Sequence, residues 1–163
     1  MKGFDWTSFT KKIAIKASIS DIYNAWTKTA ELEKWFLERA GFYNSDKVVD
    51  SNANAAVGCT YEWIWYLYEE PMKGRITEAN GNDFLQFTFE GECIVNVKLS
   101  EDKGYTIVEL EQHNIPTDDH SKKFIRLGCS HGWAFYLVNL KSVYEGGIDL
   151  RNKDSSLDPM INN

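Results

Sequence analysis

The stretch GCSHGWAFYLVNLKSVYEGG, residues 128–147, decides the fold of this chain. Its first seventeen positions hold one charged side chain, Lys141, although the 163-residue chain has a formal net charge of −6. A membrane-spanning helix needs about 20 mostly apolar residues. The uncharged run covers only positions 127–140, and polar residues such as Ser130 and Asn139 interrupt it. The stretch therefore predicts a long helix that protein covers on more than one side.

Both sides of this predicted helix are apolar. At about 100° per residue, one stripe holds Cys129, Trp133, Tyr136, Leu137, Leu140 and Tyr144, which we expect to pack on another layer. The opposite side holds Phe124, Leu127, Phe135 and Val138. Because soluble monomers rarely leave such a patch bare, we expect it to be covered. The candidates are the N-terminal segment with Phe4, Trp6 and Phe9, the loop before Gly58, the C-terminal tail, or a second copy of the chain.

Alternating apolar and polar residues predict five consecutive strands upstream of this helix. They cover about 59–67, 72–79, 83–90, 92–100 and 105–113. The pair Asn80-Gly81 predicts a two-residue hairpin turn between the second and third of them. Since short connections join antiparallel neighbours, we expect an antiparallel meander.

The N-terminal third changes its pattern twice. Residues 9–17 alternate as in a half-buried strand, and helical spacing follows from Ser18, which resembles a capping box with Asp21. Thr29 is expected to end this helix and to cap a short second one that ends near Phe36. The segment that follows, up to residue 57, is rich in Asn, Ser and Asp. It predicts irregular structure with room for one short strand.

The long helix is expected to begin with Thr117 or Asp118 as N-cap and to end at Gly146. A single sheet with one apolar face needs a cover, and this helix is the only predicted element long enough to provide it. We therefore predict one α+β domain over residues 1–163, with a core at about 10–147 and a frayed tail at 148–163. The fold would be a helix-grip fold, in which a curved antiparallel sheet wraps around the C-terminal helix and two short helices follow the first strand.

Composition excludes several classes of function. Lys and Arg residues do not cluster, which argues against nucleic acid and against an anionic membrane surface as partners. The N-terminus lacks the apolar run of a signal peptide. Cys59, Cys93 and Cys129 are widely spaced among apolar residues, which is typical of reduced core thiols. We expect a cytoplasmic protein that binds neither nucleic acid nor membrane.

Six short motifs follow one another over about residues 10–145. They are Trp26-Thr27, Glu33-Lys34-Trp35-Phe36, Gly74-Arg75-Ile76, Phe87-Thr88-Phe89, Thr106-Ile107-Val108-Glu109-Leu110 and Gly132-Trp133. In this order they resemble the START-like (SRPBCC) helix-grip superfamily, and within it the family of the activator of heat-shock protein 90 ATPase homologue. The resemblance implies a binder of small apolar molecules. A separate chaperone-contacting domain, which the best-known members carry, is not expected here, so a chaperone contact has no support beyond the family name.

Residues suited to catalysis or metal binding are few. His131, beside Gly132, could act as an acid or base if it pointed into a cavity, or it could be a half-buried side chain with a structural role. Glu109, Glu111 and His113 share one face of a predicted strand, a spacing that could hold a metal, but this face is expected to be solvated. We therefore expect no cofactor, no metal and no defined reaction. A cyclase- or hydratase-type enzyme, known elsewhere in the superfamily, is the weakest alternative.

Aromatic residues make up 14% of the chain, with six Trp. Those on the predicted inward faces either fill the core or line a cavity between sheet and helix. If they line a cavity, its walls are Trp26, Trp35, Phe36, Trp63, Trp65, Phe87, Phe89, Val95, Val108, Trp133 and Leu137. The sequence thus predicts a module that binds or carries a small apolar molecule. The alternative is a protein–protein interaction module, chaperone-related or homodimeric.

Overall fold

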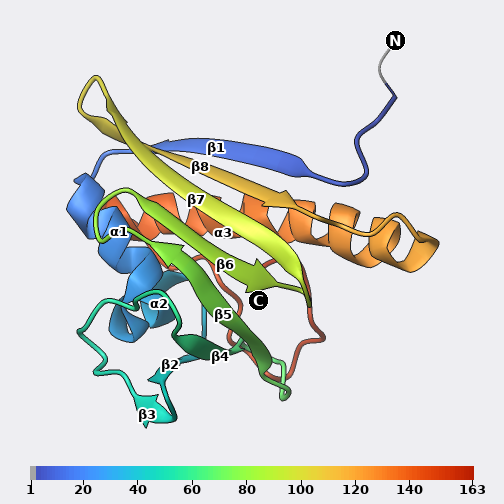
Figure 1. Cartoon of the computed structure of the whole chain (residues 1–163), viewed down its shortest axis with the longest axis horizontal. Helices are drawn as coiled ribbons and strands as arrows, with labels where there is room; N and C mark the ends of the chain where they lie inside the picture. The colour runs from blue at the N-terminus through green and yellow to red at the C-terminus, as the bar shows by residue number, and fades with distance from the viewer. Residues whose placement is uncertain (1–2) are drawn as a thin grey trace.

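A computed structural model describes residues 3–163 of the chain. In chain order its elements are β1 (Phe9–Ile15), α1 (Ile19–Thr27), α2 (Thr29–Trp35), β2 (Arg39–Asn44), β3 (Lys47–Val48), β4 (Thr60–Ile64), β5 (Met72–Ala79), β6 (Phe84–Phe89), β7 (Cys93–Asp102), β8 (Tyr105–His113), the π-helix η1 (Ser121–Leu127) and α3 (Gly128–Tyr144). Figure 1 shows the strands as one curved sheet with the long C-terminal helix lying across one face.

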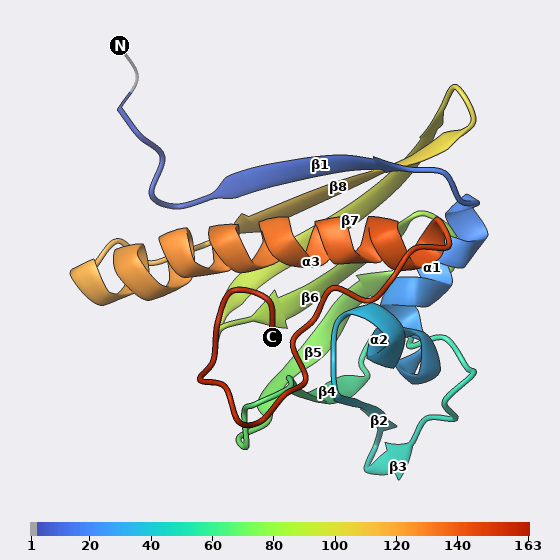
Figure 2. The same cartoon turned by 180° about the vertical axis from the view of Figure 1, so that it is seen from behind.

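The sheet is antiparallel throughout, with the strand order β1-β8-β7-β6-β5-β4-β2-β3. The first strand pairs with the last, and α1 and α2 carry the chain from that edge to the other end of the sheet. Seen from behind, α3 runs along the concave face, and α1 and α2 lie near its C-terminal end (Figure 2). The predicted α+β helix-grip fold is confirmed.

Together, η1 and α3 form the long helix predicted from the sequence. This helix has the predicted limits and the predicted inner face. Asp118 caps its N-terminus by accepting hydrogen bonds from the backbone N–H and the hydroxyl of Ser121, at 3.0 and 2.6 Å. Gly146, with φ of 81°, ends it. The predicted inner stripe is buried except Tyr144, which is half-buried. The π-helical form of η1 was not predicted, since its residues carry no pattern that separates it from an ordinary helix. Within residues 3–163, no helix has both the length and the apolar character that crossing a membrane requires.

Two predicted strand limits were wrong. The segment after α2 forms a hairpin of two strands, β2 and β3, where one short strand was expected. Strand β4 stops at Ile64, three residues before the predicted end at Leu67. Leu67 has φ of 66°, a left-handed conformation that cannot continue a strand.

Two turn predictions also need correction. Thr29 is the first residue of α2 and does not cap it; Lys28 occupies the N-cap position without a side-chain hydrogen bond. The β5–β6 turn spans the four residues 80–83 instead of two, since β5 ends at Ala79 and β6 begins at Phe84. Asn80 closes it, since its Oδ1 accepts hydrogen bonds from the backbone N–H groups of residues 82, 83 and 84 at 3.0 Å.

The C-terminal tail is held in place, so the prediction that it frays was wrong. The side chain of Arg151 is 1% exposed and donates hydrogen bonds to the carbonyls of Leu37 and Glu33, both at 2.9 Å. Its guanidinium also pairs with Asp149 at 2.8 Å, and Asn139 of α3 donates to Asp149 at 3.0 Å. Figure 2 shows the tail returning beneath α3 toward the sheet.

The expected cover of the outer helix face is only partial. Phe135 is half-buried and lies 5.2 Å from the ring of Tyr136. Phe124, Leu127 and Val138 remain 55%, 38% and 50% exposed. The N-terminal segment packs elsewhere on the helix, around Arg126, whose guanidinium lies over the ring of Phe4 and whose Nε donates to the carbonyl of Asp5.

Gly74 lies directly opposite Tyr61 across the β4–β5 pair. A Cβ at Gly74 would overlap the Tyr61 ring. That ring is fully buried, and its hydroxyl donates to the carbonyl of Thr88 at 2.5 Å, so it cannot move aside. We expect Gly74→Ala to lower the free energy of unfolding, measured by urea denaturation, by about 2 kcal/mol. Gly132→Ala, which would meet nothing within 4 Å, is the control and should not destabilise the protein. Equal stability of the two variants would contradict this explanation.

Candidate functional site

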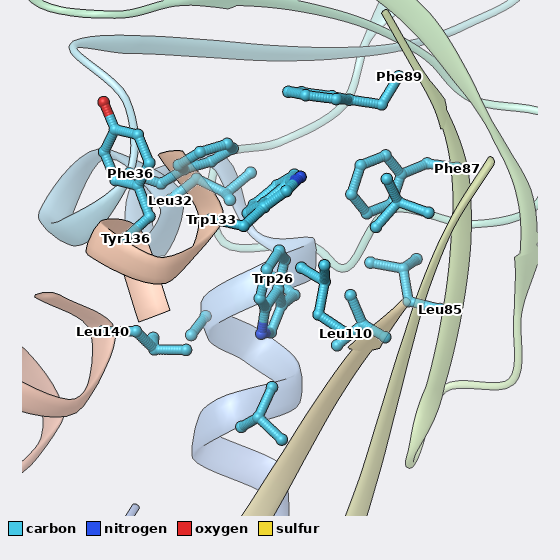
Figure 3. Close-up of a cluster of buried hydrophobic side chains, with 14 of the residues drawn as sticks. Trp26, Leu32, Phe36, Leu85, Phe87, Phe89, Leu110, Trp133, Tyr136 and Leu140 are labelled. Carbon is cyan, nitrogen blue, oxygen red and sulfur yellow. The ribbon is translucent and has the colours of Figure 1, made fainter. Parts of the chain in front are cut away.

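The space between α3 and the middle of the sheet is filled by aromatic rings. Trp26 lies at the centre, 4.8 Å from Trp35 and 5.8 Å from Trp133 between ring centroids. Trp63 stacks on Tyr61 at 3.8 Å. Figure 3 shows Trp26 and Trp133 converging with side chains from the sheet. At this level the aromatic residues form a packed core, in which Trp26, Trp35 and Trp63 are at most 1% exposed.

A pocket of about 370 Å³ lies at one end of this core. The start of α3, the beginning of β5, the end of β6, the loop after β4 and the C-terminal tail meet there. Its floor consists of rings that the core already buries, Phe36, Phe89, Trp133 and Tyr136. Its rim includes four aromatic or aliphatic side chains that are more than half exposed, Tyr68, Phe124, Met160 and Ile161. The pocket is therefore an open apolar hollow with an aromatic floor.

The floor is rigid because each ring is fixed by its neighbours. Phe36 stacks on Trp133, with ring centroids 5.2 Å apart, and Phe89 lies 5.0 Å from Trp133 (Figure 3). The indole N–H of Trp133 donates to Oε1 of the buried Gln112 in β8 at 3.0 Å. This hydrogen bond satisfies a buried donor and fixes the ring orientation.

The predicted cavity residues fall into two groups. Four of them line the pocket: Phe36, Trp65, Phe89 and Trp133. The other seven do not line it and are buried in the core, at most 2% exposed: Trp26, Trp35, Trp63, Phe87, Val95, Val108 and Leu137. Tyr136 was not among the predicted cavity residues, although it belongs to the same helical stripe as Trp133. Glu90 and the tail residues were not predicted either, because no periodic pattern exists for them.

An acidic side chain, Glu90, and an imidazole, His131, line the pocket at its rim. The structure places His131 on the exposed side of α3. Glu90 follows β6 in a left-handed turn with Gly91, at φ of 54° and 80°. Its side chain is exposed, but its apolar surroundings partly desolvate the carboxylate. This desolvation raises the pKa of Glu90 above its ordinary value.

Other polar groups at the pocket are buried and suit a structural role. Burial raises the pKa of the Cys129 thiol to about 12, which makes it a poor nucleophile. Burial also raises the pKa of Tyr136, whose hydroxyl donates to the carbonyl of Asn163. All three cysteines are buried and unpaired in the part of the chain that the structure describes.

The acidic residues considered as metal ligands pair across strands instead. Glu109 forms a salt bridge with Lys12 at 2.5 Å. Asn96 donates to Glu111 at 3.2 Å and lies 3.3 Å from Nε2 of His113. No group of three or more His, Cys, Asp or Glu side chains suited to a metal ion occurs within residues 3–163.

Comparison with known proteins supports the fold. Residues 16–145 match the family model described as Activator of Hsp90 ATPase homolog 1-like protein, whereas none of the curated proteins matches the chain. Among solved structures, the Aha1 dimer from Colwellia psychrerythraea is 22% identical at a TM-score of 0.67, covering 86% of this chain and 97% of that one. Protein SSP2350 from Staphylococcus saprophyticus is 16% identical at a TM-score of 0.69, covering 88% and 96%. DynU16, described as a putative protein in the dynemicin biosynthetic locus, is 15% identical at 0.69, covering 90% and 50%.

Proposed function

Because the chain belongs to the family of Activator of Hsp90 ATPase homolog 1-like proteins, we propose that it uses this helix-grip fold to bind a small apolar molecule. The ligand would occupy the pocket at the end of the core, and the protein would act as a binding or carrier module. The observation that carries the proposal is the pocket itself, whose volume of about 370 Å³ and aromatic lining fit the usual range for small-molecule sites.

The wall residues have distinct roles in this proposal. Phe36 and Trp133 form a floor that needs no reorganisation, because both are already packed and ordered. Trp65 and Met72, which are half-buried, would lose their remaining solvent contact on binding. Burial of apolar surface contributes about 25 cal/mol per Å², so these side chains would supply much of the affinity. The seven buried residues of the predicted set would support the floor without touching the ligand.

The uncharged dye Nile red tests the proposal. We expect saturable binding to the folded protein with a shift in tryptophan emission, because Trp65 and Trp133 line the pocket. Trp65→Ala should weaken binding about tenfold, the loss expected when a large aromatic contact is removed. Trp6→Ala is a matched control, since Trp6 is also half-buried but lies outside the pocket. Absence of saturable binding, or equal weakening by both substitutions, would contradict a site at this pocket.

A homodimer is the second candidate, and the exposed outer side of α3 favours it. Leu127 and Val138 lie about three turns apart on that side, with the exposed Ala134 between them. The similar Colwellia structure is described as a dimer. Light scattering should give twice the monomer mass for the wild type and the monomer mass for Val138→Glu. Ile148→Glu, at an exposed residue after the helix, should not change the mass. A monomeric wild type would exclude this candidate.

A further inference from the structure

We infer that the ligand of this pocket carries a positively charged ammonium group, with Glu90 as its counter-charge. The inference rests on the proposed function and specifies the chemical class of the ligand. It would distinguish the protein from a carrier of fatty acids or other apolar anions.

The carboxylate of Glu90 is free to receive such a group. Within residues 3–163 it forms no hydrogen bond or salt bridge, whereas Glu92, two residues on, pairs with Arg75 at 3.0 Å. The turn that holds Glu90 is left-handed at both Glu90 and Gly91, and Glu90 lies at the rim of the pocket. A charge in such surroundings gains from a partner more than a fully solvated charge does.

The chain itself supplies little positive charge at this place. Among the described residues, no Lys or Arg lines the pocket. The nearby tail cations, Arg151 and Lys153, both pair with Asp149. The other basic groups near the rim lie around Phe124. The Nζ of Lys123 lies 4.9 Å from the centre of the Phe124 ring but does not line the pocket. The ring of His120 lies 4.8 Å from that of Phe124 and acts on Glu90 electrostatically, and His131 lies on the rim itself.

The walls suit a cation as well. Phe36, Phe89 and Trp133 on the floor, with Trp65 and Tyr68 beside them, surround the pocket with aromatic rings. Aromatic faces attract ammonium groups, and recognition of quaternary ammonium ligands uses such rings. A carboxylate ligand would instead meet Glu90 as a like charge without a Lys or Arg in the lining to offset it.

Three naphthalene probes of similar shape test the inference by isothermal titration calorimetry. They are naphthalen-2-ylmethyl-trimethylammonium, its uncharged analogue in which a carbon atom replaces the nitrogen, and naphthalen-2-ylacetate. We expect the ammonium probe to bind about tenfold more tightly than the uncharged one, the combined size of an exposed cation–π contact and a partly solvated ion pair. The acetate should bind more weakly than the uncharged probe.

Two substitutions between β6 and β7 test whether Glu90 causes the preference for the ammonium probe. Glu90→Gln keeps the size and hydrogen-bonding capacity of the side chain and should bring the ammonium and uncharged probes to equal affinity. Glu92→Gln removes the same charge two residues away and should leave the tenfold preference intact. Circular dichroism melts check that both variants fold.

The outcomes separate this inference from the proposed function. If the uncharged probe binds the wild type and the ammonium probe has no advantage, the inference is wrong and the apolar site stands. The inference is equally wrong if the acetate binds best, or if Glu92→Gln abolishes the preference as fully as Glu90→Gln. If none of the three probes binds, the apolar site fails and the inference fails with it.

Discussion

Replacing Trp133 by alanine is expected to lower the free energy of unfolding by about 3–5 kcal/mol. The indole is 2% exposed and lies between rings from three other parts of the chain, Trp26, Phe36 and Phe89. Removing it would leave a cavity that these fixed rings cannot close. It would also leave the Oε1 atom of Gln112 without its hydrogen-bond donor. Urea denaturation of the purified variant measures the loss.

Two further variants separate the contributions. Trp133→Phe keeps most of the ring and removes the indole N–H, so we expect a smaller loss of about 1–2 kcal/mol, the cost of leaving a buried partner unsatisfied. Trp6→Ala removes a half-buried indole outside this core and should cost less than Trp133→Ala. A loss below about 1 kcal/mol for Trp133→Ala would contradict its place at the centre of the ring cluster, since burial and cavity terms together exceed that value.

The position of Trp133 was predictable because a helix has a fixed period. The stripe that contains Trp133 and Leu137 follows from spacing alone, and so does the alternation that points Val108 and Leu110 of β8 toward the helix. The same alternation places Gln112 on this inner face, although its polar side chain offered no reason to expect burial. Periodicity therefore predicts which side chains of an element face inward, whereas the hydrogen bond that Trp133 donates to Oε1 of the buried Gln112 is visible only in the structure.

Periodicity does not tell which inward-facing rings fill the core and which line a pocket. Trp63 and Trp65 are two residues apart and were predicted to be equivalent, yet Trp63 is 1% exposed and Trp65 lies beyond the end of β4, at the pocket. The difference depends on where the strand stops. Beyond Ile64 the chain turns, with a hydrogen bond from the backbone N–H of Tyr68 to the carbonyl of Trp65 and a left-handed Leu67, a conformation that has no signal in the residue type.

The tail was the least predictable part of the site. Arg151 gains its fixed position from the carbonyls of Glu33 and Leu37, more than one hundred residues earlier in the chain. Its own neighbours, RNKDSS, are polar and give no pattern. Only the C-terminal end of α2 and the residues that follow it, which present the carbonyls of Glu33 and Leu37, make a buried arginine favourable there.

Arg151→Met is accordingly expected to lower the free energy of unfolding by about 3 kcal/mol, the usual effect of removing one partner of a buried ion pair. Met retains much of the apolar stem but leaves the two carbonyls without their donor and removes the buried cationic partner of Asp149. Lys153→Met is the matched control. Lys153 pairs with the same carboxylate at 2.9 Å, but its side chain is 47% exposed, so its removal should cost less than about 1 kcal/mol. Equal losses in urea denaturation would contradict the distinction between the two cations.

The dependence of stability on pH gives an independent measure of the same contact. Burial alone would raise the pKa of Asp149, but the hydrogen bonds from Arg151, Lys153 and Asn139 outweigh it and hold that pKa well below its usual range. A carboxyl group whose pKa is depressed by folding stabilises the protein above its unfolded pKa of about 4 and loses this contribution as the pH falls toward the folded pKa. The wild type should therefore lose stability below about pH 4, and Arg151→Met should lose less over that interval because its Asp149 is less depressed. If both proteins lose the same amount, the pairing with Arg151 is not what holds Asp149 ionised.

Since Met160 and Ile161 reach the pocket rim only through this anchored tail, weaker Nile red binding by Arg151→Met at neutral pH would link the anchor to the pocket.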